Sequence, residues 1–370
     1  MRRSLIVLAL TAIAGARTTP AFASPFTLTT LATNATDPAL INPWGLASSA
    51  TSPLWIGVNG SGTSEIYNGA GVKQALVVTI PGDGSVTGVV FNSGGFNGDA
   101  FLFASEDGTI SGWRGALGTN AEVLQIADTD NVYKGLAAAS VGGFNYAYAA
   151  NFKSGAIDVL KGNAAAPDLA GTFLDPVLPA GYAPFNIQNL GGTLYVTYAL
   201  QDSTKTDDEP GLGHGIVDRF DVNGVLLGRV VTGGALNSPW GLAIAPSGFG
   251  ALGGALLVGN FGDGLIHAYN PLSGLLLDTL TDASNNPIVI DGLWALRAGN
   301  GGNGGDPEKV YFTAGPNGET GGQFGSLAGS APGISTVPEP ATFALVGAGL
   351  VAAIRRRRCS RRQTGPDRIA

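Results

Sequence analysis

Four polar side chains stand at similar points of a repeated pattern, where each could supply an oxygen ligand to a metal ion. Asn59, Glu106, Asn151 and Asn260 each follow an apolar run and precede a turn. A hard cation such as Ca²⁺ takes about six to eight oxygen ligands and needs negative charge among them. The four residues would offer that chemistry in a fold that brings them to one axis, and Asp291 is the candidate for a further acid.

The same positions have a second interpretation that needs no metal. Asn and Glu side chains before a turn often satisfy backbone groups of that turn. The sequence does not establish a cofactor, and Ca²⁺ is the one cofactor that it suggests. It also lacks the G-x-S-x-G elbow, the Walker loop and the H-E-x-x-H motif, and its two histidines, His214 and His267, are too few for a histidine-rich metal site.

Two tryptophans in near-identical contexts form a second candidate site. Trp44 lies in NPWGLA and Trp240 in SPWGLA. Indole faces can stack on the apolar side of a sugar ring, which makes the pair a candidate for ligand stacking. The alternative is that both side chains pack in the core or line an axis.

A sixfold repeat must position these residues. Each copy begins with a bulky or polar residue, usually followed by Gly and an aliphatic residue, and continues with an apolar strand, a turn and another strand. The six landmark residues are Trp44, Thr87, Lys134, Phe185, Trp240 and Asp291. Six copies of roughly four strands predict an all-β, six-bladed β-propeller, because packing blades around an axis buries faces that one blade leaves exposed. A pair of β-sandwiches is the alternative fold.

Several local features refine this prediction. Residues 26–34, FTLTTLATN, precede the first repeat and are expected to complete the last blade. The Gly after most landmarks is expected to let the innermost strands approach one another near the axis. Residues 201–213, a charged insertion in the fourth blade, and residues 297–308, rich in Gly and Asn, are expected to be loops.

The repeat pattern resembles NHL-type and related six-bladed propellers over most of residues 26–327. The candidate metal residues are also similar to the Glu, Asn and Asp set of metal-dependent lactonase propellers of the gluconolactonase type. That second resemblance implies a lactonase- or lyase-like enzyme that uses the central channel. It is the alternative to a non-catalytic function.

The N-terminus has the three parts of a secretory signal peptide. Arg2 and Arg3 are followed by the largely apolar residues 5–14, and Ala21-Phe22-Ala23 supplies a cleavage site. Residues 1–23 are therefore expected to be removed. The single cysteine, Cys359, lies near the C-terminus, so the mature domain is expected to have neither disulfides nor thiol chemistry.

The C-terminal region combines a proline-flanked motif, a short apolar run and a basic cluster. The apolar run covers residues 341–354, and a helix of that length spans about 21 Å, less than the roughly 30 Å core of a bilayer. It is therefore expected to be a short transmembrane helix that anchors the chain only transiently. The motif consists of Val337, Pro338, Glu339 and Pro340, and the basic cluster of Arg355, Arg356, Arg357 and Arg358.

This arrangement resembles the PEP-CTERM sorting signal of Gram-negative bacteria, which an exosortase recognises. The resemblance implies export, transient anchoring in the inner membrane, and release to the cell surface or the extracellular matrix. The expected organisation is a signal peptide at 1–23, the propeller at 24–327, a flexible spacer at 328–336, the sorting signal at 337–362 and a tail at 363–370.

Without its two ends the chain is strongly acidic. Ten of the 20 basic residues but only two of the 27 acidic residues lie in those ends, which leaves a net charge near −15. Nucleic acid is therefore not expected as a partner, because phosphate binding needs clustered Lys and Arg. The sequence predicts an exported, non-catalytic binding or structural module whose partners are an exosortase, the inner membrane during sorting, and exopolysaccharide.

Overall fold

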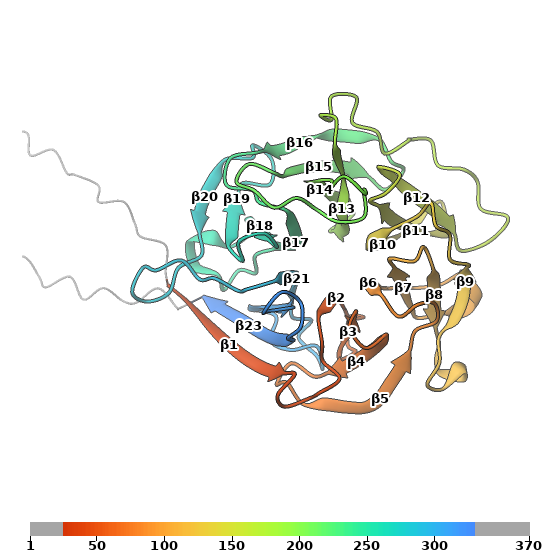
Figure 1. Ribbon diagram of the computed structural model, residues 1–370, viewed down its shortest axis with the longest axis horizontal. Coiled ribbons are helices and arrows are strands. Elements are labelled where there is room, and N and C mark those ends of the chain that lie inside the picture. Colours follow the sequence, from red (N-terminus) through yellow and green to blue (C-terminus); the bar gives the residue numbers. More distant parts are fainter. Residues whose placement is uncertain (1–24, 330–370) are drawn as a thin grey trace, which may run out of the picture. The chain divides into compact units, whose positions relative to one another are not determined.

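Six antiparallel sheets surround a central axis (Figure 1). The structure, a computed structural model, describes residues 25–329. The predicted all-β, six-bladed propeller is confirmed, and the alternative of two β-sandwiches is wrong. The chain divides into two units, Met1–Ala331 and Pro332–Ala370, and the propeller belongs to the first. The expected signal peptide and sorting signal lie outside the described residues.

Within each blade the strands follow chain order from the axis outward, apart from the outermost strand of the sixth blade. The first three blades are β2 (Pro43–Ala47), β3 (Leu54–Val58), β4 (Thr63–Tyr67) and β5 (Lys73–Thr79); β6 (Val86–Phe91), β7 (Phe101–Ser105), β8 (Ile110–Trp113) and β9 (Glu122–Gln125); and β10 (Tyr133–Val141), β11 (Phe144–Asn151) and β12 (Ala156–Lys161). The next two are β13 (Tyr182–Leu190), β14 (Thr193–Leu200), β15 (Ile216–Asp221) and β16 (Leu226–Thr232); and β17 (Pro239–Ile244), β18 (Leu256–Asn260), β19 (Ile266–Tyr269) and β20 (Leu276–Thr279). Within residues 25–329, three 3-10 helices lie in connections: η1 (Phe96–Gly98), η2 (Gly115–Leu117) and η3 (Gly250–Leu252).

The sixth blade joins the two ends of the described chain. It consists of β21 (Leu293–Ala298), β22 (Lys309–Ala314), β23 (Gln323–Gly329) and the N-terminal β1 (Phe26–Thr33). β1 pairs antiparallel with β23, from Phe26 opposite Gly329 to Thr33 opposite Gln323, and Figure 1 shows the two strands side by side. The prediction that residues 26–34 complete the last blade is confirmed. Such closure leaves no unpaired strand between the first and last repeats.

The third blade departs from the expected four strands. Its sheet contains only β10, β11 and β12, and the connection from β12 to β13 contains no strand. β12 is therefore the outermost strand of this blade.

None of the helices found in residues 25–329 is long and apolar enough to cross a membrane.

Close approach of the inner strands explains the repeated glycine. A Cβ atom on Gly45 would lie 2.5 Å from the Thr87 carbonyl oxygen in the next blade and 2.6 Å from the Val89 amide nitrogen. Both contacts are with backbone, which cannot rotate away. The prediction that glycine permits close packing near the axis is confirmed.

Replacing Gly45 with alanine should lower the free energy of unfolding by about 2 kcal/mol, because the added methyl group overpacks the contact between two blades. Chemical denaturation of the two proteins measures this. Gly115→Ala is the matched control, since a Cβ there meets nothing within 4 Å and should change stability by less than about 0.5 kcal/mol. Equal stability of the two variants would show that the inner strands can separate at no cost.

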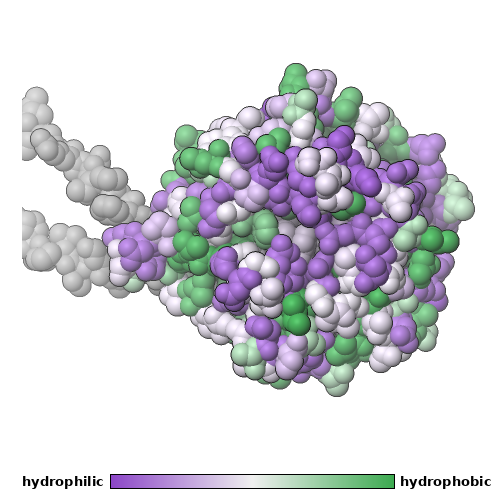
Figure 2. Space-filling model, viewed as in Figure 1, coloured by the Kyte–Doolittle hydropathy of each residue, from purple (hydrophilic) through white to green (hydrophobic). Residues whose placement is uncertain are grey.

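The surface is hydrophilic toward the centre of one face and more apolar around the rim (Figure 2). Several exposed large hydrophobic side chains lie on outer strands, among them Val123 on β9, Leu227 on β16, and Leu276 and Leu277 on β20. The hydrophobic core instead lies between the blades and along the axis. On this face, polar side chains are therefore concentrated near the end of the axis (Figure 2).

Candidate functional site: the axial mouth

Each inner strand contributes one side chain to a ring around the axis. In β2 a bulge separates the pair Pro43 and Val58 from the pair Leu46 and Ile56. The same irregularity recurs near the start of the other five inner strands and identifies their equivalent residues. The ring consists of Trp44, Thr87, Lys134, Phe185, Trp240 and Trp294.

One predicted member of this ring is wrong. The bulge of β21 lies between Leu293 and Leu296, which makes Trp294 the equivalent of Trp44. Asp291 instead precedes β21, is exposed, and accepts a hydrogen bond from the backbone N–H of Asn317 at 2.8 Å. Asp291 was predicted because Gly292 follows it, as Gly follows most landmark residues. The actual ring residue, Trp294, is followed by Ala295.

Aromatic side chains fill the axis at this ring. The indoles of Trp44 and Trp294 stack with centroids 3.5 Å apart, and Trp240 packs edge-on against both. Phe261 also stacks on Trp294, at 4.1 Å. Trp44 and Trp240 are only 3% and 4% exposed. A sugar could therefore stack on either predicted tryptophan only if this aromatic cluster opened.

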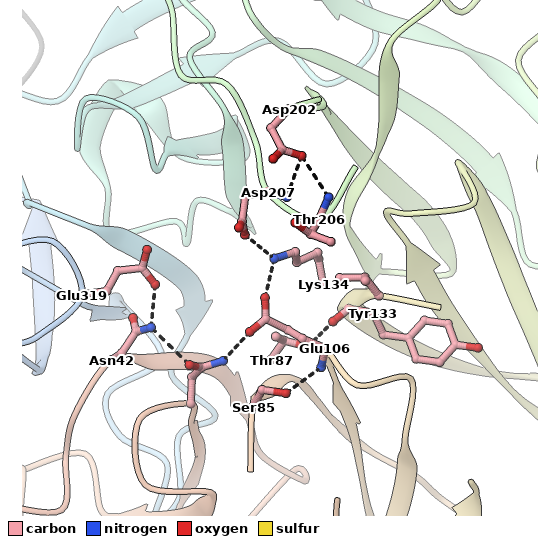
Figure 3. Close-up of polar contacts among 12 residues, drawn as sticks. Asn42, Ser85, Thr87, Glu106, Tyr133, Lys134, Asp202, Thr206, Asp207 and Glu319 are labelled. Atoms are coloured by element: carbon pink, nitrogen blue, oxygen red, sulfur yellow. Dashed lines mark hydrogen bonds and ion pairs between the residues drawn. The ribbon is translucent and has the colours of Figure 1, made fainter. Parts of the chain in front are cut away.

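A lysine ammonium lies at the end of the axis where the inner strands begin (Figure 3). Lys134 Nζ is 3.0 Å from a carboxylate oxygen of Asp207 and forms a second ion pair with Glu106. It also lies 5.3 Å from the centroid of the Trp44 ring, within range of a cation–π contact. The Lys134 side chain is 1% exposed, whereas those of Glu106 and Asp207 are 27% and 73% exposed. We define the axial mouth as Asn42, Asn59, Glu106, Lys134, Asp207 and Glu319.

Two asparagines connect the carboxylates of the axial mouth to the aromatic cluster. Asn59 Nδ2 donates to Glu106 at 3.0 Å, and Asn42 Nδ2 donates to Glu319 at 2.6 Å. Asn42 Oδ1 accepts the indole N–H of Trp294 at 2.9 Å. The polar groups of the axial mouth are thus held by hydrogen bonds among side chains from different blades.

The axial mouth contains more acidic than basic groups. Burial by itself would lower the pKa of Lys134, but the charges of Glu106 and Asp207 outweigh burial and hold that pKa above its usual range. Burial raises the pKa of Glu319, and it also raises the pKa of the neighbouring Asp208. The ammonium stays charged at neutral pH, and the surplus of carboxylates favours ligands that donate hydrogen bonds or carry positive charge.

The charged insertion brings Asp207 to the axis. Residues 201–213 form a loop, as expected, in which Gln201 and Asp208 form an antiparallel bridge. The backbone N–H of Asp202 donates to the Asp207 carbonyl at 2.8 Å, and the Asp202 carboxylate accepts the Thr206 N–H at 3.0 Å. The loop is therefore folded on itself and holds Asp207 in position.

Only two of the five residues predicted for a metal ring come together. Asn59 and Glu106 face each other in the axial mouth. Asn151 accepts the backbone N–H of Val132 and of Ser154, and Asn260 donates to the Ala235 carbonyl. These two asparagines thus satisfy backbone groups near their own turns, the second interpretation of the pattern.

A one-residue offset explains the difference. The backbone N–H groups of Asn59 and Glu106 each donate to a carbonyl group in the segment just before the inner strand of their blade. In the third and fifth blades the equivalent hydrogen bonds come from Phe152 and Phe261. Asn151 and Asn260 therefore lie one position earlier than the predicted alignment requires. Because successive side chains of a strand point to opposite sides, a shift of one position directs the side chains of Asn151 and Asn260 away from the axis.

The residues that complete the axial mouth were absent from the predicted site. Lys134 could have been recognised from the sequence, because it is the one charged residue among the six ring positions, which are otherwise aromatic or Thr. Asn42, Asp207 and Glu319 lie in connections and carry no such signal. Within residues 25–329 no group of three or more His, Cys, Asp or Glu side chains is arranged to hold a metal ion. In the axial mouth, a protein ammonium contacts the Glu106 carboxylate that was predicted to bind Ca²⁺.

A second buried charge cluster lies within the fourth blade, away from the axis. Arg229 Nε is 3.2 Å from Asp218, and the Arg229 guanidinium also pairs with Asp175. Asp218 is fully buried. Burial raises its pKa to about 7, and the charge of Asp175 adds to this effect.

This cluster predicts a pH-dependent stability. A carboxyl group whose pKa is raised by folding stabilises the folded protein fully at pH values below its ordinary pKa. That contribution is lost as the pH rises through the pKa of the group in the folded protein. Between about pH 4 and pH 7, the wild type should therefore lose about 3 kcal/mol of stability relative to Asp218→Asn. Denaturation at several pH values measures the difference. Asp168→Asn, in an exposed pair with Lys161, is the control, and parallel curves for wild type and Asp218→Asn would contradict the prediction.

The C-terminal region matches a known sorting signal. Residues 336–358 match the PEP-CTERM protein-sorting motif. The motif indicates an exported protein that an exosortase sorts to the cell surface or the extracellular space. The resemblance predicted from the residues around Glu339 is confirmed.

Solved structures of low sequence identity align with much of this chain. A streptogramin B lyase structure aligns over 82% of this chain and 97% of its own, with a TM-score of 0.48 and 11% identity. A nidogen/laminin complex contains a chain that aligns over 69% of this chain and 82% of its own, with a TM-score of 0.47 and 14% identity.

Sequence relatives occur in Acanthamoeba polyphaga mimivirus. Uncharacterized protein R648 is 32% identical over 236 residues, which cover 61% of this chain and 56% of that protein. Uncharacterized protein L690 is 31% identical over 298 residues, which cover 74% of this chain and 76% of that protein. With this identity over most of both proteins, the chain belongs to the same family as mimivirus protein L690.

Proposed function

We propose that this exported protein is a non-catalytic binding module of the cell surface or extracellular matrix, and that its axial mouth binds carbohydrate. The observation that carries the proposal is the hydrogen-bonded set of carboxylates, amides and one ammonium at the axial mouth. Sugar hydroxyls both donate and accept hydrogen bonds. A rigid array of acceptors and donors suits them, because little side-chain entropy is lost on binding.

Exposure of the carboxylates supports this proposal. The side chains of Glu106 and Asp207 are 27% and 73% exposed, while Lys134 beneath them is buried. A ligand would therefore meet carboxylate oxygens first, with the ammonium fixing their positions. The acidic mature chain favours neutral or amino sugars over acidic ones at this site, because like charges repel.

The route to the surface is a further part of the proposal. An exosortase would cleave near residues 337–340 after the apolar run has held the chain transiently in the inner membrane. The mass of the protein in its native host tests this. Protein released without residues 355–370 supports it, and full-length protein retained in a host with a working exosortase would contradict it.

A binding screen tests the site. The exported protein, purified from its host, should bind host exopolysaccharide or a set of neutral and amino-sugar oligosaccharides, and Asp207→Asn should weaken binding at least tenfold. Asp207 is largely exposed, so this variant should fold normally. Asp168→Asn, at an exposed pair elsewhere, is the control. A screen without any binding, or equal binding by wild type and Asp207→Asn, would refute the assignment.

One observation favours the enzyme alternative. Carboxyl groups with raised pKa values, Glu319 and Asp208, lie in the electrostatic environment of Lys134, and such perturbed groups are frequent at catalytic sites. A lactonase- or lyase-like activity would then depend on these groups rather than on the predicted metal ring. Turnover of lactone or polysaccharide substrates that disappears in Glu319→Gln would establish this alternative. Melting temperatures with and without Ca²⁺ test whether the folded protein binds that ion.

A further inference from the structure

The opposite end of the axis contains a cavity that does not belong to the axial mouth. The inner strands run away from the axial mouth, so residues near their ends lie at the other end of the axis. A cavity of about 70 Å³ is present there. Its lining includes Gly45, Gly88, Asn186, Gln188, Trp240 and Arg297. Gln188 and Arg297 also line an adjoining, more open hollow with Ile244 and Ala298.

The arginine in this lining has no counter-ion among residues 25–329. Arg297 Nε donates to Ser48 Oγ at 3.1 Å, and Nη2 donates to the Ser48 carbonyl at 2.8 Å. Both acceptors are neutral, and these two bonds leave further N–H groups of the guanidinium unused. Arg114 and Arg229, by contrast, each pair with two carboxylates.

Arg297 is a partly buried residue without a charged partner. This partial burial lowers the pKa of its guanidinium to about 10, and no neighbouring charge offsets the effect. The group is still charged at neutral pH. A guanidinium that lines a cavity and an adjoining hollow, has no carboxylate partner and keeps unused N–H groups is placed to bind an anion there.

A neutral amide stands beside the arginine in both hollows. Gln188, near the end of β13, lines the cavity and the adjoining hollow together with Arg297. Its side-chain amide has no hydrogen-bond partner within the part of the chain that the structure describes. An amide N–H and a guanidinium fork are together suited to the two oxygens of a carboxylate.

We propose that Arg297 and Gln188 form a binding site for the carboxylate group of an acidic ligand that enters from the end of the axis opposite the axial mouth. The cavity has room for the carboxylate itself, and the adjoining hollow has room for the rest of the ligand. A uronic acid or a small organic acid has this chemistry. The site is separate from the proposed carbohydrate site and does not depend on it.

Titration with acetate and with galacturonate at constant ionic strength, against chloride as reference, tests the proposal. Both acids should raise the melting temperature of the exported protein, galacturonate more than acetate. Arg297→Met and Arg297→Lys should weaken binding, the first at least tenfold and the second less, because lysine keeps the charge but loses the fork. Inorganic phosphate should give a smaller shift than acetate.

Gln188→Glu keeps the test decisive if Arg297→Met fails to fold. It places a carboxylate of nearly the same shape beside Arg297, so it should keep or raise the melting temperature and abolish the response to both acids. Asp168→Asn should respond like the wild type. The proposal is overturned if neither acid shifts the wild type, if phosphate binds more tightly than the carboxylates, or if Gln188→Glu responds as strongly as the wild type.

Discussion

Replacing Lys134 with methionine is expected to lower the free energy of unfolding by about 3 kcal/mol. The substitution keeps the apolar stem of the side chain but removes the buried ammonium that pairs with Glu106 and Asp207. The two carboxylates would then repel each other at the axis without a cation between them. Chemical denaturation at neutral pH measures the loss.

A double-mutant cycle shows whether the ion pair is the cause. Glu106→Gln in the Lys134→Met background removes one of the unpaired charges and should restore about 1 kcal/mol of the lost stability. Lys153→Met, at a partly exposed lysine that donates a hydrogen bond to the Thr129 carbonyl, is the matched control and should have little effect. A Lys134→Met protein as stable as the wild type would mean that the ammonium does not hold the axial mouth together.

Replacing Trp294 with alanine should cost about 4 kcal/mol, within the range for a fully buried tryptophan. Its indole stacks on both Trp44 and Phe261, and its N–H donates to Asn42. The substitution leaves a cavity at the axis and removes a hydrogen bond that orients the axial mouth. Thermal and chemical denaturation together give the change.

Trp294→Phe separates the two roles of the indole. It keeps most of the aromatic contact but not the N–H donor, so it should cost about 1 to 2 kcal/mol and leave Asn42 without its donor. Trp113→Ala, at a partly exposed tryptophan of the second blade, is the control and should cost much less than Trp294→Ala. Equal losses at the two positions would contradict the view that the aromatic cluster closes the axis.

Features that recur from blade to blade because of strand packing could be predicted from the sequence. The closing strand was predictable because residues 26–34 form a strand-like segment left over before the first repeat. The glycine after most landmarks was predictable because a residue without Cβ lets neighbouring inner strands approach closely, as the 2.5 Å contact at Gly45 shows. The blade count follows from the same repeat.

The site was harder to predict, because its register depends on single residues. The pattern placed Asn151 and Asn260 with Asn59 and Glu106, yet an offset of one position sends two of the four side chains away from the axis. Asp207 and Glu319 reach the axial mouth from loops, whose course depends on contacts such as those of Asp202. No periodicity in the sequence encodes such contacts.

The most direct test of a carbohydrate-binding axial mouth is calorimetric titration of host exopolysaccharide into the exported protein, beside its Asp207→Asn and Asp168→Asn variants. Saturable binding is expected for the wild type and for Asp168→Asn, and at least tenfold weaker binding for Asp207→Asn at an unchanged melting temperature. Equal affinity in all three proteins, or no heat of binding to the wild type, would contradict it.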